Sequence, residues 1–231
     1  VSYYDRTIQI PSYKFSGIQL SSFSEATYNH KGEKSEWITG LNLWSDKFNQ
    51  NKSDTSKVVD YNHTTFGAFI QNTWNATEKF ILETGLRGDY QNEYDFFALP
   101  RISALLKANP KLSMRLGGGL GYKTPTVFTE DAERIQFRNV LPINVSKTKA
   151  EQSIGGNFDI NYKTPLSDKM FFSINALLFY TQVKNPLVLV PTMTGLYEFQ
   201  QPKGFIDTKG IETNIKLTYG DYKLFIGYTL A

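Results

Sequence analysis

The sequence predicts an all-β chain, namely an antiparallel up-and-down segment of a transmembrane β-barrel, and two regularities carry this prediction. The first is an alternation of apolar and polar residues, clearest in residues 80–91, where Leu82 and Leu86 fall on the apolar face. A period of two residues indicates a β-strand. The second is the alternation of short turns with mostly longer loops, which is typical of strands that cross a bilayer back and forth.

The polar face of these strands is expected to face the lumen of the barrel, and the apolar face is expected to face lipid. The apolar faces extend over about ten residues and are rich in aromatic residues near their ends, as in lipid-facing strands. A charge introduced at Leu82 should therefore impair assembly far more than loss of the charge at Arg87. The side chains expected to face the lumen include Glu83, Arg87, Asp89, Arg101 and Arg115.

Turn-forming residues divide the chain into eleven expected strands. They span residues 1–10, 17–30, 35–46, 63–75, 80–91, 97–108, 112–122, 149–163, 170–183, 205–219 and 222–231. Pro100 cannot donate to a ladder and suggests a local edge or bulge. Short turns are expected at 31–34, 75–79, 109–111, 163–169 and 220–221. The second set of connections comprises residues 11–16, 47–62, 92–96, 123–148 and 184–204.

Composition limits the alternatives. The length of 231 residues allows one domain, and no run of about 18 apolar residues exists, which excludes helical membrane spans. The net charge of +3 is too small to argue for a nucleic-acid partner. The absence of cysteine excludes disulfides and thiolate metal sites. No cofactor is expected.

A soluble β-sandwich is the main alternative fold. Its polar face should be dominated by charge, whereas the faces that carry Arg101, Ser103 and Lys107 are mixed, as in a barrel lumen. Single-chain bacterial barrels almost always have an even number of strands, and an open sheet leaves costly unpaired edges in lipid. The odd count therefore leads us to expect an internal piece of a larger barrel.

The glycine-rich stretch 117–121 does not fit a nucleotide site. A phosphate-binding loop needs glycine directly before its lysine, but Tyr122 precedes Lys123, and Pro125 stands where a helix should begin. The stretch is better read as a strand face that another part of a protein approaches closely.

Three neighbouring motifs resemble the barrel of TonB-dependent outer-membrane receptors. They are Gly121-Tyr122-Lys123-Thr124-Pro125, a long loop containing Thr129-Glu130-Asp131-Ala132-Glu133, and Lys147-Thr148-Lys149-Ala150-Glu151-Gln152-Ser153. Residues 65–74, 86–90 and 207–214 match the same family, so that the resemblance covers nearly the whole chain.

The resemblance implies a 22-stranded barrel in the outer membrane of a Gram-negative bacterium. It also implies an N-terminal plug that contacts the TonB complex, and we expect this plug and the final strands to be absent from this chain. The implied partners are the TonB complex, outer-membrane lipid or lipopolysaccharide, and a small-molecule nutrient, with no nucleic acid.

Two loops hold the candidate ligand-binding residues. Arg134 and Arg138, together with Tyr122, could receive an anionic iron chelate, because guanidinium groups pair well with carboxylate and catecholate oxygens. Loop 184–204 could add a stacking surface through Tyr197, Phe199 and Lys203. The plainer alternative is that the charges of loop 123–148 are only solvated or bound to neighbouring lipopolysaccharide.

Histidine is scarce, since only His30 and His63 are present. Haem-uptake members of the family carry a histidine in the loop after the Tyr/Phe-x-x-Pro motif, and residues 126–148 contain none, which disfavours haem. A metal site needs several convergent donors, so we predict no metal site.

The leading functional hypothesis is a receptor and transporter that takes up a scarce nutrient, a ferric siderophore, with energy from TonB. Cobalamin or another organic nutrient is the alternative within the same class. An outer-membrane enzyme would have to use His63 with Asp60 and Ser53 or Ser56, and nothing fixes these groups in place, so we expect no enzyme. A passive porin is the remaining alternative.

Overall fold

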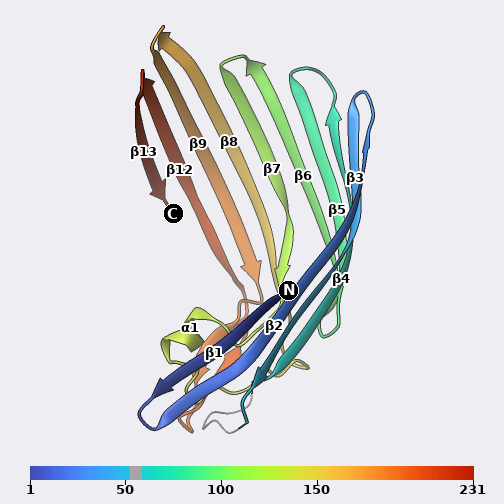
Figure 1. Cartoon of the computed structure of the whole chain (residues 1–231), viewed down its shortest axis with the longest axis vertical. Helices are drawn as coiled ribbons and strands as arrows, with labels where there is room; N and C mark the ends of the chain where they lie inside the picture. The colour runs from blue at the N-terminus through green and yellow to red at the C-terminus, as the bar shows by residue number, and fades with distance from the viewer. Residues whose placement is uncertain (53–58) are drawn as a thin grey trace.

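The computed structural model describes residues 1–52 and 59–231, and nearly all regular structure in it is β. Eleven strands form one antiparallel sheet in the order β1-β2-β3-β4-β5-β6-β7-β8-β9-β12-β13 (Figure 1). Its strands are β1 (Ser2–Ile10), β2 (Tyr13–Lys31), β3 (Ser35–Gln50), β4 (Tyr61–Asn75), β5 (Phe80–Gln91), β6 (Asp95–Asn109), β7 (Leu112–Lys123), β8 (Glu151–Ser167), β9 (Met170–Lys184), β12 (Phe205–Tyr219) and β13 (Tyr222–Leu230). The expected up-and-down order of eleven strands is confirmed.

Several strands extend beyond their expected ends. β2 begins at Tyr13 rather than at 17, β3 continues to Gln50 rather than 46, and β8 continues to Ser167 rather than 163. The apolar-polar alternation fades at these ends, but the backbone ladder does not depend on side-chain polarity and continues. The expected connections 11–16, 92–96 and 163–169 are therefore tight turns at 11–12, 92–94 and 168–169.

The long connections 123–148 and 184–204 contain regular structure that the sequence pattern does not predict. Loop 184–204 forms a hairpin of β10 (Val188–Pro191) and β11 (Tyr197–Gln200). Loop 123–148 contains α1 (Glu130–Arg134), whose N-cap Thr129 accepts a hydrogen bond from the Ala132 N–H at 3.3 Å. No helix among the described residues has the length and hydropathy needed to span a membrane.

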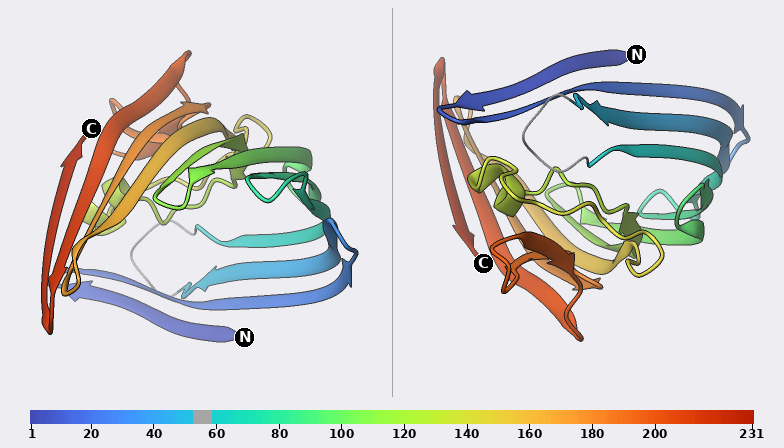
Figure 2. Two further views of the ribbon diagram at one scale, coloured as in Figure 1. Left: turned by 90° about the horizontal axis from the view of Figure 1, so that it is seen from above. Right: turned by 90° about the horizontal axis from the view of Figure 1, so that it is seen from below.

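The sheet curves strongly, so that it has a convex and a concave face (Figure 2). Leu86 and Tyr90 are 53% and 56% exposed on the convex face, whereas Asp89, between them in sequence, is 1% exposed. The same alternation recurs along the sheet and leaves a belt of exposed apolar side chains on the convex face, among them Leu41, Phe66, Ile102, Leu116, Ile154 and Leu178. This belt is the surface that a barrel strand presents to lipid.

No second sheet packs against this belt, because the other sheet among the described residues is the hairpin β10–β11. The sandwich alternative is therefore excluded. The sheet is open, with β1 and β13 as its two edges.

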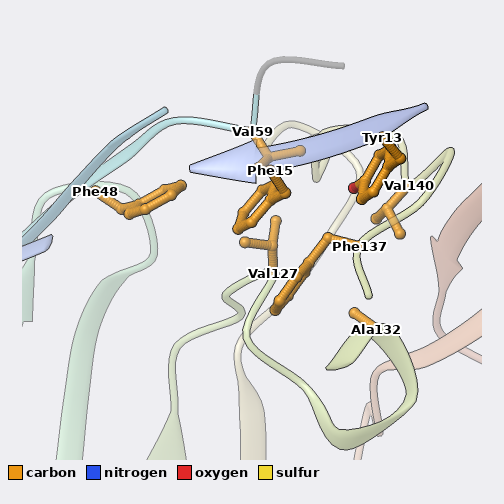
Figure 3. Packing of buried hydrophobic residues seen from close by; sticks show 8 residues of the cluster. All are labelled: Tyr13, Phe15, Phe48, Val59, Val127, Ala132, Phe137 and Val140. Carbon is orange, nitrogen blue, oxygen red and sulfur yellow. The ribbon is translucent and has the colours of Figure 1, made fainter. Parts of the chain in front are cut away.

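The buried apolar core lies at the loop end of the sheet rather than between two layers (Figure 3). Side chains of β2 and β3 meet side chains of loop 123–148 in one cluster. Its buried members are Tyr13, Phe15, Phe48, Val59, Val127, Ala132, Phe137 and Val140.

Candidate functional site

A charge pair with a buried carboxylate lies on the concave face of β5. Arg87 Nε lies 2.7 Å from Asp89 Oδ1, and Arg87 also donates to Asn42 Oδ1 on β3 at 3.3 Å. The second oxygen of Asp89 accepts a hydrogen bond from the Tyr122 hydroxyl at 3.0 Å. Both carboxylate oxygens of a nearly inaccessible Asp89 are therefore satisfied, as a buried charge requires.

Tyr122 reaches this pair because β7 separates from β6 near the C-terminal end of β7. The pairing of β6 with β7 stops at Arg101 and Gly119, next to Pro100, which has no N–H to donate. Beyond that point the Tyr122 ring stacks on Phe97 at 3.9 Å between centroids. Strand alternation alone would place Tyr122 on the convex face with Leu120, so the break in pairing brings it to the concave face.

A second polar network lies on the concave face of β1 to β4. Asp46 accepts hydrogen bonds from Gln19 Nε2 at 2.9 Å and from the Tyr61 hydroxyl at 3.0 Å, and Ser21 Oγ also donates to it. Gln19 in turn accepts from Arg6 Nε at 2.7 Å. Neither Arg6 nor Asp46 is among the residues expected from the sequence to form a site. The signal that could have indicated them is a charged residue on the polar face of an amphipathic strand.

A cavity of about 380 Å³ lies between the two networks. Aromatic, acidic and basic side chains converge on it, which is the composition of sites that orient a polar small molecule. Its lining includes Trp44, Asp46, His63, Thr65, Arg87, Asp89, Tyr122 and Lys123.

Loop 123–148, which we call the cap, folds back over the concave face. Phe137 stacks on Phe15 at 4.5 Å between centroids, and Phe128 packs edge-on against Phe48 at 4.9 Å. The Arg6 guanidinium lies 4.3 Å from the centroid of Phe128, so the cap also rests on the second network. The Tyr13 hydroxyl donates to the Gln136 carbonyl at 2.9 Å.

The structure does not gather the other expected ligand-binding residues around the cavity. Arg134 is exposed and pairs with Glu130 at 3.1 Å, and Arg138 is exposed over the Tyr13 ring. Tyr197 and Phe199 on β11 pack against the apolar cluster, and Lys203 is exposed in the connection to β12. Tyr197 and Phe199 therefore contribute to the packing of the cap while both remain half-buried.

Three further residues expected to face the lumen share the concave face of β5 to β7. They are Glu83, Arg101 and Arg115, and none of them forms an ion pair within residues 1–52 and 59–231.

His63 is buried between aromatic rings rather than placed at an open rim. Its ring lies 5.0 Å from Tyr61 and 5.9 Å from Tyr94 between centroids. Burial, with a smaller contribution from the Glu93 carboxylate, raises the pKa of Tyr94 to about 12. His30 is exposed near the end of β2. No group of three or more potential metal ligands occurs in the described part of the chain.

Of the residues considered for an enzyme, Asp60 and His63 lie in the described part of the chain. Asp60 Oδ1 accepts the backbone N–H of Gln50 at 2.6 Å, so the structure gives this oxygen a structural partner. Ser53 and Ser56 lie outside the described residues.

Comparison with known proteins gives a family match over almost the whole chain. The family model described as TonB dependent receptor-like, beta-barrel matches residues 2–231. No curated protein sequence matches the chain.

Solved structures share the fold at low sequence identity. The siderophore receptor PirA from Pseudomonas aeruginosa matches with a TM-score of 0.69 at 15% identity, over 99% of this chain and 43% of that one. The ferric enterobactin receptor PfeA matches with a TM-score of 0.71 at 14% identity, over 95% of this chain and 36% of that one. The Serratia marcescens hemophore receptor HasR, solved with its hemophore HasA and heme, matches with a TM-score of 0.70 at 14% identity, over 94% of this chain and 41% of that one. The chain thus spans less than half the length of each.

Proposed function

The chain belongs to the TonB-dependent receptor-like β-barrel family, and we propose on this premise that it forms part of an outer-membrane receptor that imports a scarce nutrient with energy from TonB. The observation that carries the proposal is the family match over the entire sheet, including the strands that build the concave cavity. The proposed ligand class is a ferric siderophore.

Two observations support an iron chelate as the ligand. Several proteins with the same fold are named as siderophore receptors or iron transporters. In this chain, Arg134 and Arg138 are exposed on the cap, where guanidinium groups could attract an anionic chelate before it reaches the cavity. Cobalamin or another organic nutrient is the alternative ligand within the same receptor function.

The packed cap favours a receptor over a passive porin. An open channel would need the concave face to stay clear, whereas the cap lies over it and is held by Phe128 and Phe137. Enzyme activity has no support, because the family and the fold are those of receptors and transporters.

The proposed partners follow from the two faces of the sheet. The convex apolar belt suits outer-membrane lipid in a Gram-negative bacterium, with lipopolysaccharide at the loop end. The concave face would surround a plug domain that the TonB complex contacts. In this proposal, the plug and the remaining strands belong to parts of the receptor other than this chain.

Uptake of a radiolabelled ferric siderophore by cells that carry the full-length receptor tests the proposal. Uptake should require both the receptor and TonB, and uptake that persists without TonB would contradict the proposed energy source. Arg134→Ala/Arg138→Ala should weaken binding more strongly at low salt than at high salt, because exposed charges are screened over about 8–10 Å at physiological ionic strength. Lys169→Ala/Lys223→Ala, which removes two exposed lysines at the short-turn end, is the matched control.

A further inference from the structure

A hollow of about 490 Å³ lies at the short-turn end of the sheet, where β5, β6, β7 and β8 meet their turns. Four lysines line it: Lys79, Lys107, Lys111 and Lys163. We call it the lysine hollow. The cap lies at the other end of the sheet, so this feature is separate from the candidate site described above (Figure 1).

Backbone hydrogen bonds join the four lysines in two pairs. The Lys107 N–H donates to the Lys79 carbonyl at 2.7 Å, and the Lys163 N–H donates to the Lys111 carbonyl at 2.8 Å. The lysines therefore form two pairs, each joined directly by a backbone hydrogen bond across neighbouring segments. Such a pair places the two lysine side chains on neighbouring segments whether or not an anion is present.

The lysine hollow carries a large uncompensated charge. One acidic residue, Glu78, stands against the four lysines, which gives the lining a formal charge of +3, as large as that of the whole chain. None of the four lysines forms an ion pair within residues 1–52 and 59–231. Their mutual repulsion would be relieved by an anionic partner.

The hollow lies on the concave face rather than toward lipid. Lys107 lies opposite Ser113, and Ser113 lies opposite Asn161, so a hydroxyl and an amide stand between the lysines. Leu106 and Tyr162 directly precede Lys107 and Lys163 in sequence, and their side chains are exposed on the opposite, convex face. A phosphate of a membrane lipid is therefore a poor fit.

We propose that the lysine hollow binds a carboxylate-rich polypeptide segment, whose aspartate or glutamate side chains pair with the four lysines. The volume equals that of about sixteen water molecules at about 30 Å³ each, far more than one small anion fills. Leu105, Pro110 and Leu112 supply apolar lining for the aliphatic parts of such a segment. The proposal concerns a partner at the short-turn end and does not rest on the nature of the nutrient.

Zero-length carbodiimide cross-linking of outer membranes that contain the full-length receptor tests this proposal. The reagent joins a lysine amine to a carboxylate in direct contact, and peptide mass spectrometry then identifies both residues. Cross-links from Lys107 and Lys163 to a segment rich in Asp and Glu are expected, and they should disappear at about 1 M salt, where the Debye length is about 3 Å. Lys169 and Lys223, exposed at the same end but outside the hollow, should give none.

A variant pair separates the hollow from general surface charge. Lys107→Gln/Lys163→Gln should lower the cross-linking yield of the remaining Lys79 and Lys111 by about tenfold. The loss of two exposed charge pairs weakens binding of the acidic segment by about that factor. Lys169→Gln/Lys223→Gln should leave it unchanged. Heat-modifiable electrophoretic mobility checks that each variant is assembled.

The proposal is overturned if the hollow lysines give no cross-link, or if the control lysines cross-link equally well. Protection of the hollow lysines from acetylation by inorganic phosphate, without any cross-link to a carboxylate, would assign the hollow to a small anion and would also overturn it. Nutrient uptake is not measured in this experiment, so a failure of the proposed function would not affect its outcome.

Discussion

Replacing Arg87 by leucine should destabilise the protein strongly, although sequence reasoning expects a mild effect at a position that faces the lumen. The reason lies in Asp89, whose side chain is 2% exposed and whose Oδ1 is 2.7 Å from Arg87 Nε. Removing the guanidinium leaves a buried carboxylate with Tyr122 as its remaining hydrogen-bond donor among the described contacts.

The expected cost can be worked from this burial. Breaking a buried ion pair by removing one partner costs about 3–5 kcal/mol, mainly because the other charge stays desolvated. The Arg87 side chain is itself 37% exposed, so water reaches the pair and the lower end of this range applies. A loss of about 3 kcal/mol changes the unfolding equilibrium by more than about a hundredfold.

Urea denaturation of the full-length receptor in lipid bilayers measures this loss. Arg87→Leu/Asp89→Asn is the decisive second variant, because it removes both charges and keeps an oxygen that can accept from Tyr122. It should recover most of the stability lost in Arg87→Leu, as a double-mutant cycle would show. If the double variant is no more stable than Arg87→Leu, the loss comes from packing and the buried-charge reasoning is wrong.

Three further predictions concern the lipid face, the cap and a buried phenol. Leu86→Arg places a charge on the convex belt and should lower the free energy of unfolding in bilayers by about 2–4 kcal/mol, whereas Arg115→Leu on the concave face should be tolerated; equal stabilities would contradict the assigned faces. Phe137→Ala should lower the stability of the packed cap by about 3–5 kcal/mol and should speed hydrogen exchange of residues 123–148. Met193→Ala, at an exposed position in the neighbouring loop, should change neither quantity. Because burial raises the pKa of Tyr94 from 10.0 to about 12, the folded chain holds the phenol proton more tightly than the unfolded chain. Stability relative to Tyr94→Phe should therefore fall between pH 10 and 12, and a constant difference in urea titrations would argue against this burial effect.

The arrangement of the strands could be predicted because strand alternation and turn chemistry are local. Leu86 and Asp89 were assigned to opposite faces from sequence order alone, and the structure places them so. Strand ends were less predictable, as at Tyr13 and Gln50, since the backbone ladder continues where the hydropathy pattern fades.

The candidate site was only partly predictable. Tyr122 and Asp89 were both singled out, but their hydrogen bond depends on the separation of β7 from β6 after Gly119. Tyr197 and Phe199 were expected to supply a stacking surface. They are half-buried against the cap, which is a contact between segments far apart in the chain that the sequence pattern does not predict.

The sequence by itself determined the all-β class, the order of the strands and the two faces of the sheet, because each depends on residues within one strand or one turn. The tertiary structure alone decided that the cap folds over the concave face, that Tyr122 of β7 reaches the buried Asp89 of β5, and that four lysines share one hollow. Each of these features brings together residues from different strands, or from a strand and a loop, and their distances follow from the register and curvature of the whole sheet.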